Sequence, residues 1–271
     1  MCSDLSYSHW KMEHKPILEG FSDKNIIMLF SGGKDSSVAL DLITMAKEEF
    51  GFDFKAHSAT FPNHRYTETE KIRIESYWVK RGVKIIWHDT EEKDDSLDNS
   101  KNPCLSCQEL RKNLMNSILA GSIEDWTSLV LIVSYSLWDI VSYSLEHLLT
   151  DTFSNPEQKA SIEINKRFKE TSQRFYPFLT MKEGYQIFRP LVKYNNDDIL
   201  NAANKKNLPI LSIPCNFKDY RPKKILEKYY RKMGLRFDYN QLMDFVKKSF
   251  NFPDTYSFTA IEKEDYLTNV F

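Results

Sequence analysis

An apolar run at residues 26–30 leads directly into a short loop of serine, glycine, lysine and aspartate. The loop continues into apolar residues at helical spacing. Two adjacent glycines let the backbone curve until several of its N–H groups face one point, and a helix that begins there adds partial positive charge. The pattern therefore predicts a buried strand, an anion-binding loop and a helix in immediate succession. The loop residues are Ser31, Gly32, Gly33, Lys34, Asp35, Ser36 and Ser37.

The side chains of this loop suit a polyphosphate ligand. Lys34 and the three serine hydroxyls can close around phosphate oxygens, while Asp35 can hold Mg²⁺ against them. The spacing matches neither the Walker loop nor the Gly-x-Gly-x-x-Gly dinucleotide motif. An ordinary strand–turn–helix with a serine cap is the alternative. The concentration of glycine, lysine, acid and serine in so short a window argues against it.

The composition is that of a globular protein large enough for one α/β domain with appendages. The 271 residues carry a net charge of −1, which argues against a surface built wholly for nucleic acid. No apolar run approaches the roughly 18 residues of a membrane span, and residues 1–19 lack the apolar core of a signal peptide. We therefore expect a cytoplasmic protein without a membrane partner, whose four cysteines are ligands or redox groups rather than disulfides.

Strand-like and helix-like segments alternate along most of the chain, which predicts a parallel twisted sheet with helices on both faces. We expect an extension with one short helix at 1–24, an α/β domain at 25–215 and a helical tail at 216–271. A polar insertion at about 151–173 is a candidate lid, and a charged stretch at 90–101 is expected to be a mobile loop. The expected strands are 26–30, 52–60, 83–87, 128–134 and 185–188, and the expected helices are 38–46, 68–81, 108–120, 137–149, 196–206 and, in the tail, 222–250.

Three cysteines form a candidate ligand set. Cys104 and Cys107 make a Cys-x-x-Cys at the mouth of a predicted helix, and Cys215 follows another strand-like segment. Three thiolates suit a [4Fe–4S] cluster with one iron left open for another ligand, and sulfur ligands also suit zinc. A redox disulfide between Cys104 and Cys107, or inert buried thiols, would fit the same spacing. We expect no role for Cys2, beside the first residue.

The loop sequence Ser-Gly-Gly-Lys-Asp-Ser resembles the PP-loop of the ATP pyrophosphatase superfamily, whose members cleave ATP between the α and β phosphates. Four further motifs, over roughly residues 25–250, resemble the tRNA 2-thiocytidine synthetase family of iron–sulfur tRNA thiolases. They are Phe61-Pro62-Asn63-His64, Cys104-x-x-Cys107-x-x-x-Arg111, Arg189-Pro190-Leu191 and Ile213-Pro214-Cys215-Asn216.

The resemblance implies a Rossmann-like fold of the adenine nucleotide alpha hydrolase type that uses ATP and Mg²⁺. It places a [4Fe–4S] cluster on Cys104, Cys107 and Cys215. It also implies a sulfur donor and an acceptor that is tRNA or another nucleobase-containing molecule. Whether two chains associate as a homodimer stays open. Beyond the PP-loop, the residues expected at the nucleotide are Thr60, Phe61, Arg111 and Asp139.

Two departures from the family pattern bear on the substrate. The family carries Gly-His-x-x-Asp-Asp after its fourth strand, whereas residues 134–139 keep only Asp139. The family also pairs the third cysteine with a second one nearby, and this chain has none there, which is compatible with a three-cysteine cluster. These departures, with the near-zero net charge, argue more against tRNA as the substrate than against ATP.

The predicted reaction begins when a carbonyl oxygen of the acceptor attacks the α-phosphorus of ATP. Pyrophosphate leaves, and a sulfur nucleophile then displaces AMP. Arg111 is expected either to contact phosphate or to lie on a helix surface. One alternative is another PP-loop chemistry with zinc or redox cysteines: a deazaguanine-type nitrile synthase, an amide ligase or a sulfonucleotide reductase. A second is an adenine-nucleotide sensor without catalysis.

Overall fold

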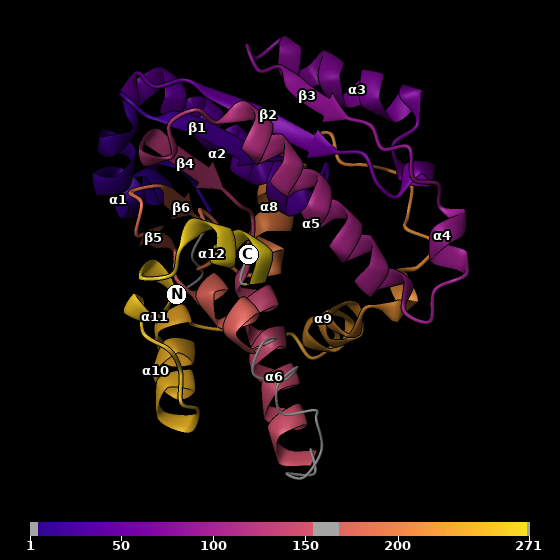
Figure 1. Cartoon of the computed structure of the whole chain (residues 1–271), viewed down its shortest axis with the longest axis vertical. Helices are drawn as coiled ribbons and strands as arrows, with labels where there is room; N and C mark the ends of the chain where they lie inside the picture. The colour runs from indigo at the N-terminus through magenta and orange to yellow at the C-terminus, as the bar shows by residue number, and fades with distance from the viewer. Residues whose placement is uncertain (1–4, 154–167, 270–271) are drawn as a thin grey trace.

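The computed structural model describes residues 5–153 and 168–269 (Figure 1). Most of the predicted insertion at 151–173 lies outside these ranges. Among the described residues, no helix combines the length and apolar character needed to cross a membrane.

A six-stranded sheet forms the centre of the molecule, in the order β3-β2-β1-β4-β6-β5. The first five strands in this order are parallel, which confirms the predicted sheet; β5 runs antiparallel to β6. The sequence analysis did not predict β5, because three residues are too few to give a periodic pattern. The strands are β1 (Asn25–Leu29), β2 (Phe54–Ala59), β3 (Ile85–His88), β4 (Leu129–Ile132), β5 (Phe178–Thr180) and β6 (Gln186–Phe188).

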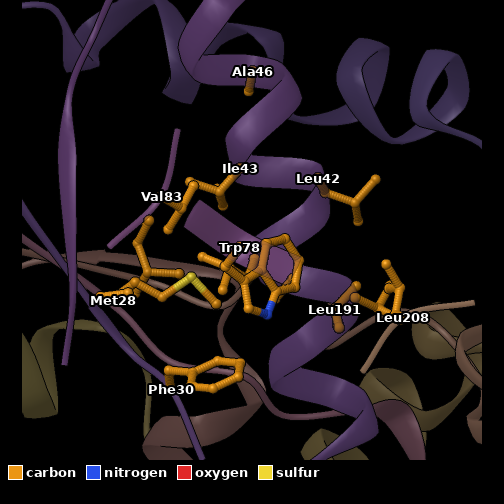
Figure 2. Packing of buried hydrophobic residues seen from close by; sticks show 14 of the residues in the cluster. Met28, Phe30, Leu42, Ile43, Ala46, Trp78, Val83, Leu191 and Leu208 are labelled. Atoms are coloured by element: carbon orange, nitrogen blue, oxygen red, sulfur yellow. The ribbon is translucent and has the colours of Figure 1, made fainter. Parts of the chain in front are cut away.

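Helices cover both faces of the sheet, which explains why β4 is apolar at every position. On one face, Figure 2 shows the indole of Trp78 among Met28 and Phe30 of the sheet region and Ile43 of a covering helix. The helices on this face are α1 (Tyr7–Leu18), α2 (Lys34–Phe50), α3 (Glu68–Val79) and α8 (Asn196–Lys205). Those on the opposite face are α5 (Pro103–Ser122), α11 (Tyr256–Thr259) and α12 (Lys263–Asn269).

Two predictions for residues 90–122 are wrong in detail. The charged stretch contains a short helix, α4 (Asp95–Asp98), whose Leu97 is fully buried and holds it against the protein. Helix α5 begins at Pro103 rather than at 108. Asn102 caps it by accepting a hydrogen bond from the Leu105 N–H at 3.2 Å, and Pro103 suits the first helical position. The Cys-x-x-Cys therefore lies within the first turns of the helix.

The tail contains several helices rather than one. Helix α9 (Pro222–Lys232) ends before Gly234, whose φ of +63° belongs to the left-handed region, and α10 (Tyr239–Ser249) follows. Trp138 of α6 (Leu137–Phe153) packs edge-on against Tyr230 of α9 with ring centroids 5.5 Å apart. This contact fixes the tail helix beside α6 (Figure 1).

The order of the strands reverses between β1 and β4. From β1 the chain proceeds through α2 to β2 on one side, and from β4 it proceeds through α6 toward β6 on the other. Open α/β sheets bind ligands at the carboxyl ends of strands at such a switch point. The serine–glycine loop follows β1, and Asp139 lies just after β4, so both border this position.

Candidate functional site

The loop after β1 turns sharply between the strand and α2. Gly32 has a φ of +64°, and Gly33 precedes the first residue of α2 in an extended conformation. The Ser36 hydroxyl donates to the Gly33 carbonyl at 3.0 Å and lies 3.1 Å from the Ser31 hydroxyl. The first N–H groups of a helix have no partner within it, so the loop presents donors and partial positive charge toward the switch point.

Residues 209–211, far along the chain, hold this loop in place by hydrogen bonds. The Leu211 N–H donates to the Gly32 carbonyl at 2.8 Å, and the Ser37 hydroxyl donates to the Pro209 carbonyl at 3.0 Å. A Cβ on residue 32 would lie 2.7 Å from Leu211 Cγ, so glycine is required there on steric grounds as well. Ser37 is fully buried, and its hydroxyl is committed to this contact.

Helix α3 holds the same segment in place. The Glu70 carboxylate accepts hydrogen bonds from the Ser212 N–H and hydroxyl, both at 2.8 Å, and Arg73 donates to the Ile210 carbonyl at 2.6 Å. The hydrogen bonds from Arg73 and Ser212 lower the pKa of Glu70 to about 2 against the effect of burial. The carboxylate is therefore ionised at neutral pH and anchors the segment.

Acids and lysines from three elements meet at the switch point. Lys34 Nζ pairs with Asp35 Oδ1 at 2.5 Å. Burial raises the pKa of Asp35, but the charges of Lys34 and Lys223 outweigh burial and hold it below its usual value. On α6, one Asp139 oxygen accepts from the Ser136 N–H and hydroxyl, both at 2.7 Å, and the other pairs with Lys223 of α9.

The three cysteines converge in one apolar cluster. Cys104 and Cys107 come from α5, Cys215 from the loop after Pro214, and all three pack with Phe61 and neighbouring apolar side chains. The Cys104 thiol donates to the Phe217 carbonyl at 3.2 Å. None of the three is bonded in a disulfide. The fold thus brings together sulfurs that lie over a hundred residues apart in the sequence.

Two arginines face these sulfurs. Burial raises the pKa of Cys107, the nearby Cys215 and Cys104 sulfurs raise it further, and the charges of Arg111 and Arg221 lower it. Burial lowers the pKa of Arg221, but a hydrogen bond to Cys104 and the charge of the sulfurs raise it above its usual value. Within the described part of the chain, the buried Nε of Arg221 has no hydrogen-bond partner. Arg111 itself is half-buried on α5, one turn beyond Cys107.

The donor set fits a sulfur-ligated group. Three thiols come from separate segments, an apolar wall surrounds them, and two adjacent guanidinium groups can offset negative charge. In residues 5–153 and 168–269, no three His, Cys, Asp or Glu side chains are already grouped to hold a metal ion. The three sulfurs share an apolar cluster but do not meet at one point.

A short 3₁₀ turn, Asn63–Arg65, anchors the loop that carries Cys215. His64 Nδ1 lies 2.9 Å from Asp94 Oδ2, and its Nε2 accepts from the Asn216 N–H at 3.2 Å. Arg65 Nε donates to the Ile213 carbonyl at 3.0 Å. The sequence analysis named His64 only as part of a motif, and no spacing pointed to Asp94, thirty residues away.

The remaining predicted nucleotide contacts lie at the end of β2. The Thr60 hydroxyl contacts the His88 carbonyl at 3.0 Å and Asp89 at 2.8 Å. Phe61 is 1% exposed and packs in the cysteine cluster. The structure therefore groups Phe61 with the sulfurs, whereas Asp139, Lys34 and Asp35 are grouped at the switch point.

Two charged residues of the site were missed by sequence reasoning. Arg221 and Lys223 lie at the start of α9, one facing the sulfurs and the other facing Asp139. In the sequence these two are among several lysines and arginines between residues 221 and 232, and no motif distinguishes them. Which lysine or arginine of a basic helix points inward depends on how the helix packs, and the contact of Trp138 with Tyr230 decides that here.

The site has a switch-point half, residues 31–37 with Asp139, and a sulfur half, the three cysteines, and a short stretch of chain joins them. Leu211 bonds to the loop at Gly32, and Cys215 follows four residues later. A stretch of four residues spans at most about 14 Å. Cys215 therefore lies within about 14 Å of Leu211, which bonds to the loop, and Cys104 and Cys107 pack with Cys215 in one cluster.

Comparisons with known proteins give one curated relative and a set of similar folds. No family model matches the chain. The chain is 24% identical over 204 residues to the tRNA-cytidine(32) 2-sulfurtransferase of Neisseria meningitidis serogroup C / serotype 2a, a match that covers 74% of the chain and 56% of that relative. The chain thus spans little more than half the length of the curated relative it matches.

Among solved structures, the U34-tRNA thiolase NcsA from Methanococcus maripaludis with its [4Fe–4S] cluster superposes with a TM-score of 0.58 at 16% identity. The superposition covers 92% of this chain and 81% of that one. The NMN synthetase from Francisella tularensis gives a TM-score of 0.46 at 12% identity. The likeness to the thiolase shows a shared fold.

Proposed function

The chain has the fold and the loop signature of the adenine nucleotide alpha hydrolase/PP-loop superfamily, and we propose that it is an ATP pyrophosphatase that activates a carbonyl group for sulfur transfer. The observation that carries the proposal is the convergence of Cys104, Cys107 and Cys215 in one cluster, with Cys215 four residues beyond Leu211, which bonds to the Ser31–Ser37 loop. A nucleotide-binding loop alone would fit many reactions, whereas three thiols beside it favour sulfur chemistry.

In the first step the carbonyl oxygen of the acceptor forms a bond to the α-phosphorus of ATP. The bond from that phosphorus to the bridging oxygen breaks, and pyrophosphate leaves with the electron pair. Negative charge grows on the leaving phosphates. The loop N–H groups, the start of α2 and the Lys34 ammonium can stabilise it. Asp35 would hold Mg²⁺, which supplies further charge neutralisation on the phosphates.

In the second step sulfur replaces the activated oxygen, and AMP leaves. Cys104, Cys107 and Cys215 would hold a [4Fe–4S] cluster, which supplies an open iron position for the incoming sulfur. Arg111 and Arg221 offset the negative charge of the cysteine sulfurs. The apolar wall of Phe61, Leu97 and Phe217 keeps water from the activated carbon, which water would otherwise hydrolyse.

The proposed acceptor is a base of tRNA. Both the curated relative and the thiolase structure are described as acting on tRNA. On this chain, α9 exposes Lys228 and Lys232 beside Tyr229, which is 57% exposed. Lysines beside an exposed aromatic ring suit a phosphate backbone with an unstacked base.

The nucleotide step is tested by measuring pyrophosphate and AMP released from Mg–ATP with and without bulk tRNA. Lys34→Ala is expected to lower the rate on the order of 10²–10³, as loss of one charge stabiliser does. Lys80→Ala, an exposed lysine at the end of α3, serves as the matched control and should leave the rate unchanged. Release of neither product by the wild-type chain would favour the nucleotide sensor instead.

The cysteine step is tested by reconstituting the anaerobic protein with iron and sulfide. We expect a broad visible absorbance and acid-labile sulfide, and we expect Cys104→Ala to abolish both. Stoichiometric zinc without labile sulfide would support another PP-loop chemistry. Full sulfur transfer by an iron-free protein would overturn the cluster assignment.

A further inference from the structure

The first turn of α9 carries two cations that point to different halves of the site. Arg221 precedes the helix, Pro222 is its first residue, and Lys223 follows. Arg221 faces the cysteine sulfurs, whereas Lys223 pairs with Asp139 at the switch point. Two residues apart, their Cα atoms are separated by at most about 7 Å. The start of α9 therefore contacts both the cysteine sulfurs and Asp139.

Lys223, whose side chain is 32% exposed, lies among charged groups from three helices. Its ammonium pairs with Asp139 of α6, lies 3.8 Å from Glu227 of its own helix and interacts with Asp35 and Lys34 of α2. Burial lowers the pKa of Lys223 to about 8, and Lys224 and Lys34 lower it further against Glu227 and Asp35. A cation in such surroundings is less well solvated than one on the surface and gains more from a new anionic partner.

Asp139 does not depend on Lys223 alone. Its second oxygen keeps the Ser136 N–H and hydroxyl as donors at 2.7 Å. When an anion enters the switch point, the ammonium can turn toward it while the carboxylate stays hydrogen-bonded. Pairing with Asp139 does not by itself require that Lys223 also interact electrostatically with Asp35 and Lys34 of the loop, as it does.

We propose that Lys223 is a phosphate-binding residue of the nucleotide site and that α9, whose first turn also sets Arg221 against the cysteine sulfurs, couples the two halves. The inference rests on the proposed function. It adds to it a binding residue supplied by the tail, outside the loop motif, and a physical link between nucleotide and sulfur sites.

The nucleotide part is tested by calorimetric binding of Mg–ATP to the full chain. Lys223→Met should weaken binding at least tenfold, because a charge-assisted hydrogen bond is lost. Lys223→Arg, which keeps the charge, should stay within about threefold of the wild type. Lys247→Met, an exposed lysine in the last turn of α10, is the matched control and should bind as the wild type does.

The outcomes separate this inference from the proposed function. If the wild type does not bind Mg–ATP at all, the proposed function fails. If the wild type binds and Lys223→Met binds equally well, Lys223 is only the counter-ion of Asp139 and the inference is wrong. Lys223→Gln, which keeps hydrogen-bonding capacity without the charge, gives the same discrimination if the methionine variant does not fold.

The coupling is tested by the rate at which iodoacetamide alkylates Cys104 in the metal-free full chain, with and without saturating Mg–ATP. In the wild type, Mg–ATP should change this rate several-fold, because a shift of Lys223 moves the turn that holds Arg221. Arg221→Met should lose the response while it still binds Mg–ATP. A response that persists in Arg221→Met would show direct shielding by the nucleotide, and no response in the wild type would show that the halves are independent; either result overturns the coupling.

Discussion

Single residues decide whether the anion-binding loop can form. Gly32 adopts a left-handed backbone conformation. Because it has no side chain, it leaves room for Leu211, which comes from a segment far along the chain. The sequence predicted a glycine for curvature. The second requirement, room for Leu211, becomes visible only when residues 32 and 211 are seen together.

Gly32→Ala is expected to destabilise the chain by about 2–4 kcal/mol, since the left-handed backbone costs about 1–2 and the contact with Leu211 adds overpacking. ATP binding should be lost, because the loop has to shift. Urea unfolding and calorimetry measure the two effects.

Gly82→Ala is the matched control, because Gly82 has a φ of +71° and no heavy atom lies within 4 Å of the place its Cβ would take. It should cost only the backbone part and leave ATP binding intact. Equal losses for the two variants would show that the contact with Leu211 is not important.

At the scale of elements, short turns place the third cysteine. The Asn63–Arg65 turn and the start of α4 share the carboxylate of Asp94, which accepts from the Asn63 N–H at 2.7 Å and the His64 N–H at 2.8 Å. His64 in turn accepts from Asn216, beside Cys215. The predicted mobile loop at 90–101 thus contains an anchor of the sulfur site.

Asp94→Asn is expected to loosen this anchor, because an amide oxygen is a weaker acceptor than a carboxylate for two N–H groups and an imidazole. The free energy of unfolding should fall by about 1–3 kcal/mol, and alkylation of Cys215 should become several-fold faster. Mass spectrometry of the labelled thiol measures the second effect.

Asp95→Asn changes the neighbouring, exposed carboxylate, for which the described residues show no side-chain hydrogen bond, and should alter neither quantity. Equal alkylation rates in the Asp94 variant and the wild type would contradict the proposed anchoring.

At the scale of the whole molecule, helix α1 packs against one face of the sheet, beside β6. Trp10 is fully buried and donates from its indole nitrogen to the Pro190 carbonyl at 2.9 Å. His14 packs edge-on against both Trp10 and Phe188 of β6. Burial lowers the pKa of His14 to about 4, despite the raising effect of Glu13.

This buried histidine predicts a loss of stability in mild acid. Its folded pKa lies below the unfolded value of about 6.5, so between these values the unfolded chain binds a proton that the folded chain excludes. The free energy of unfolding therefore falls as the pH drops through this range. Between pH 7.5 and 5.0, the wild type should lose about 2 kcal/mol more than His14→Phe.

Urea unfolding at the two pH values measures the difference. Other groups, including the buried His57, are present in both proteins and cancel. A parallel loss in both proteins would mean that His14 is protonated in the folded state.

The sequence by itself determined the strand–loop–helix, the parallel sheet and the candidate ligands, because each depends on local periodicity or on neighbours within a few residues. It did not determine the early start of α5, the strand β5 or the inward-facing cations Arg221 and Lys223. Those depend on contacts between segments far apart in the chain. The packing of α9 against α6 and the anchoring of the Cys215 loop by His64 exist only once the fold has brought them together.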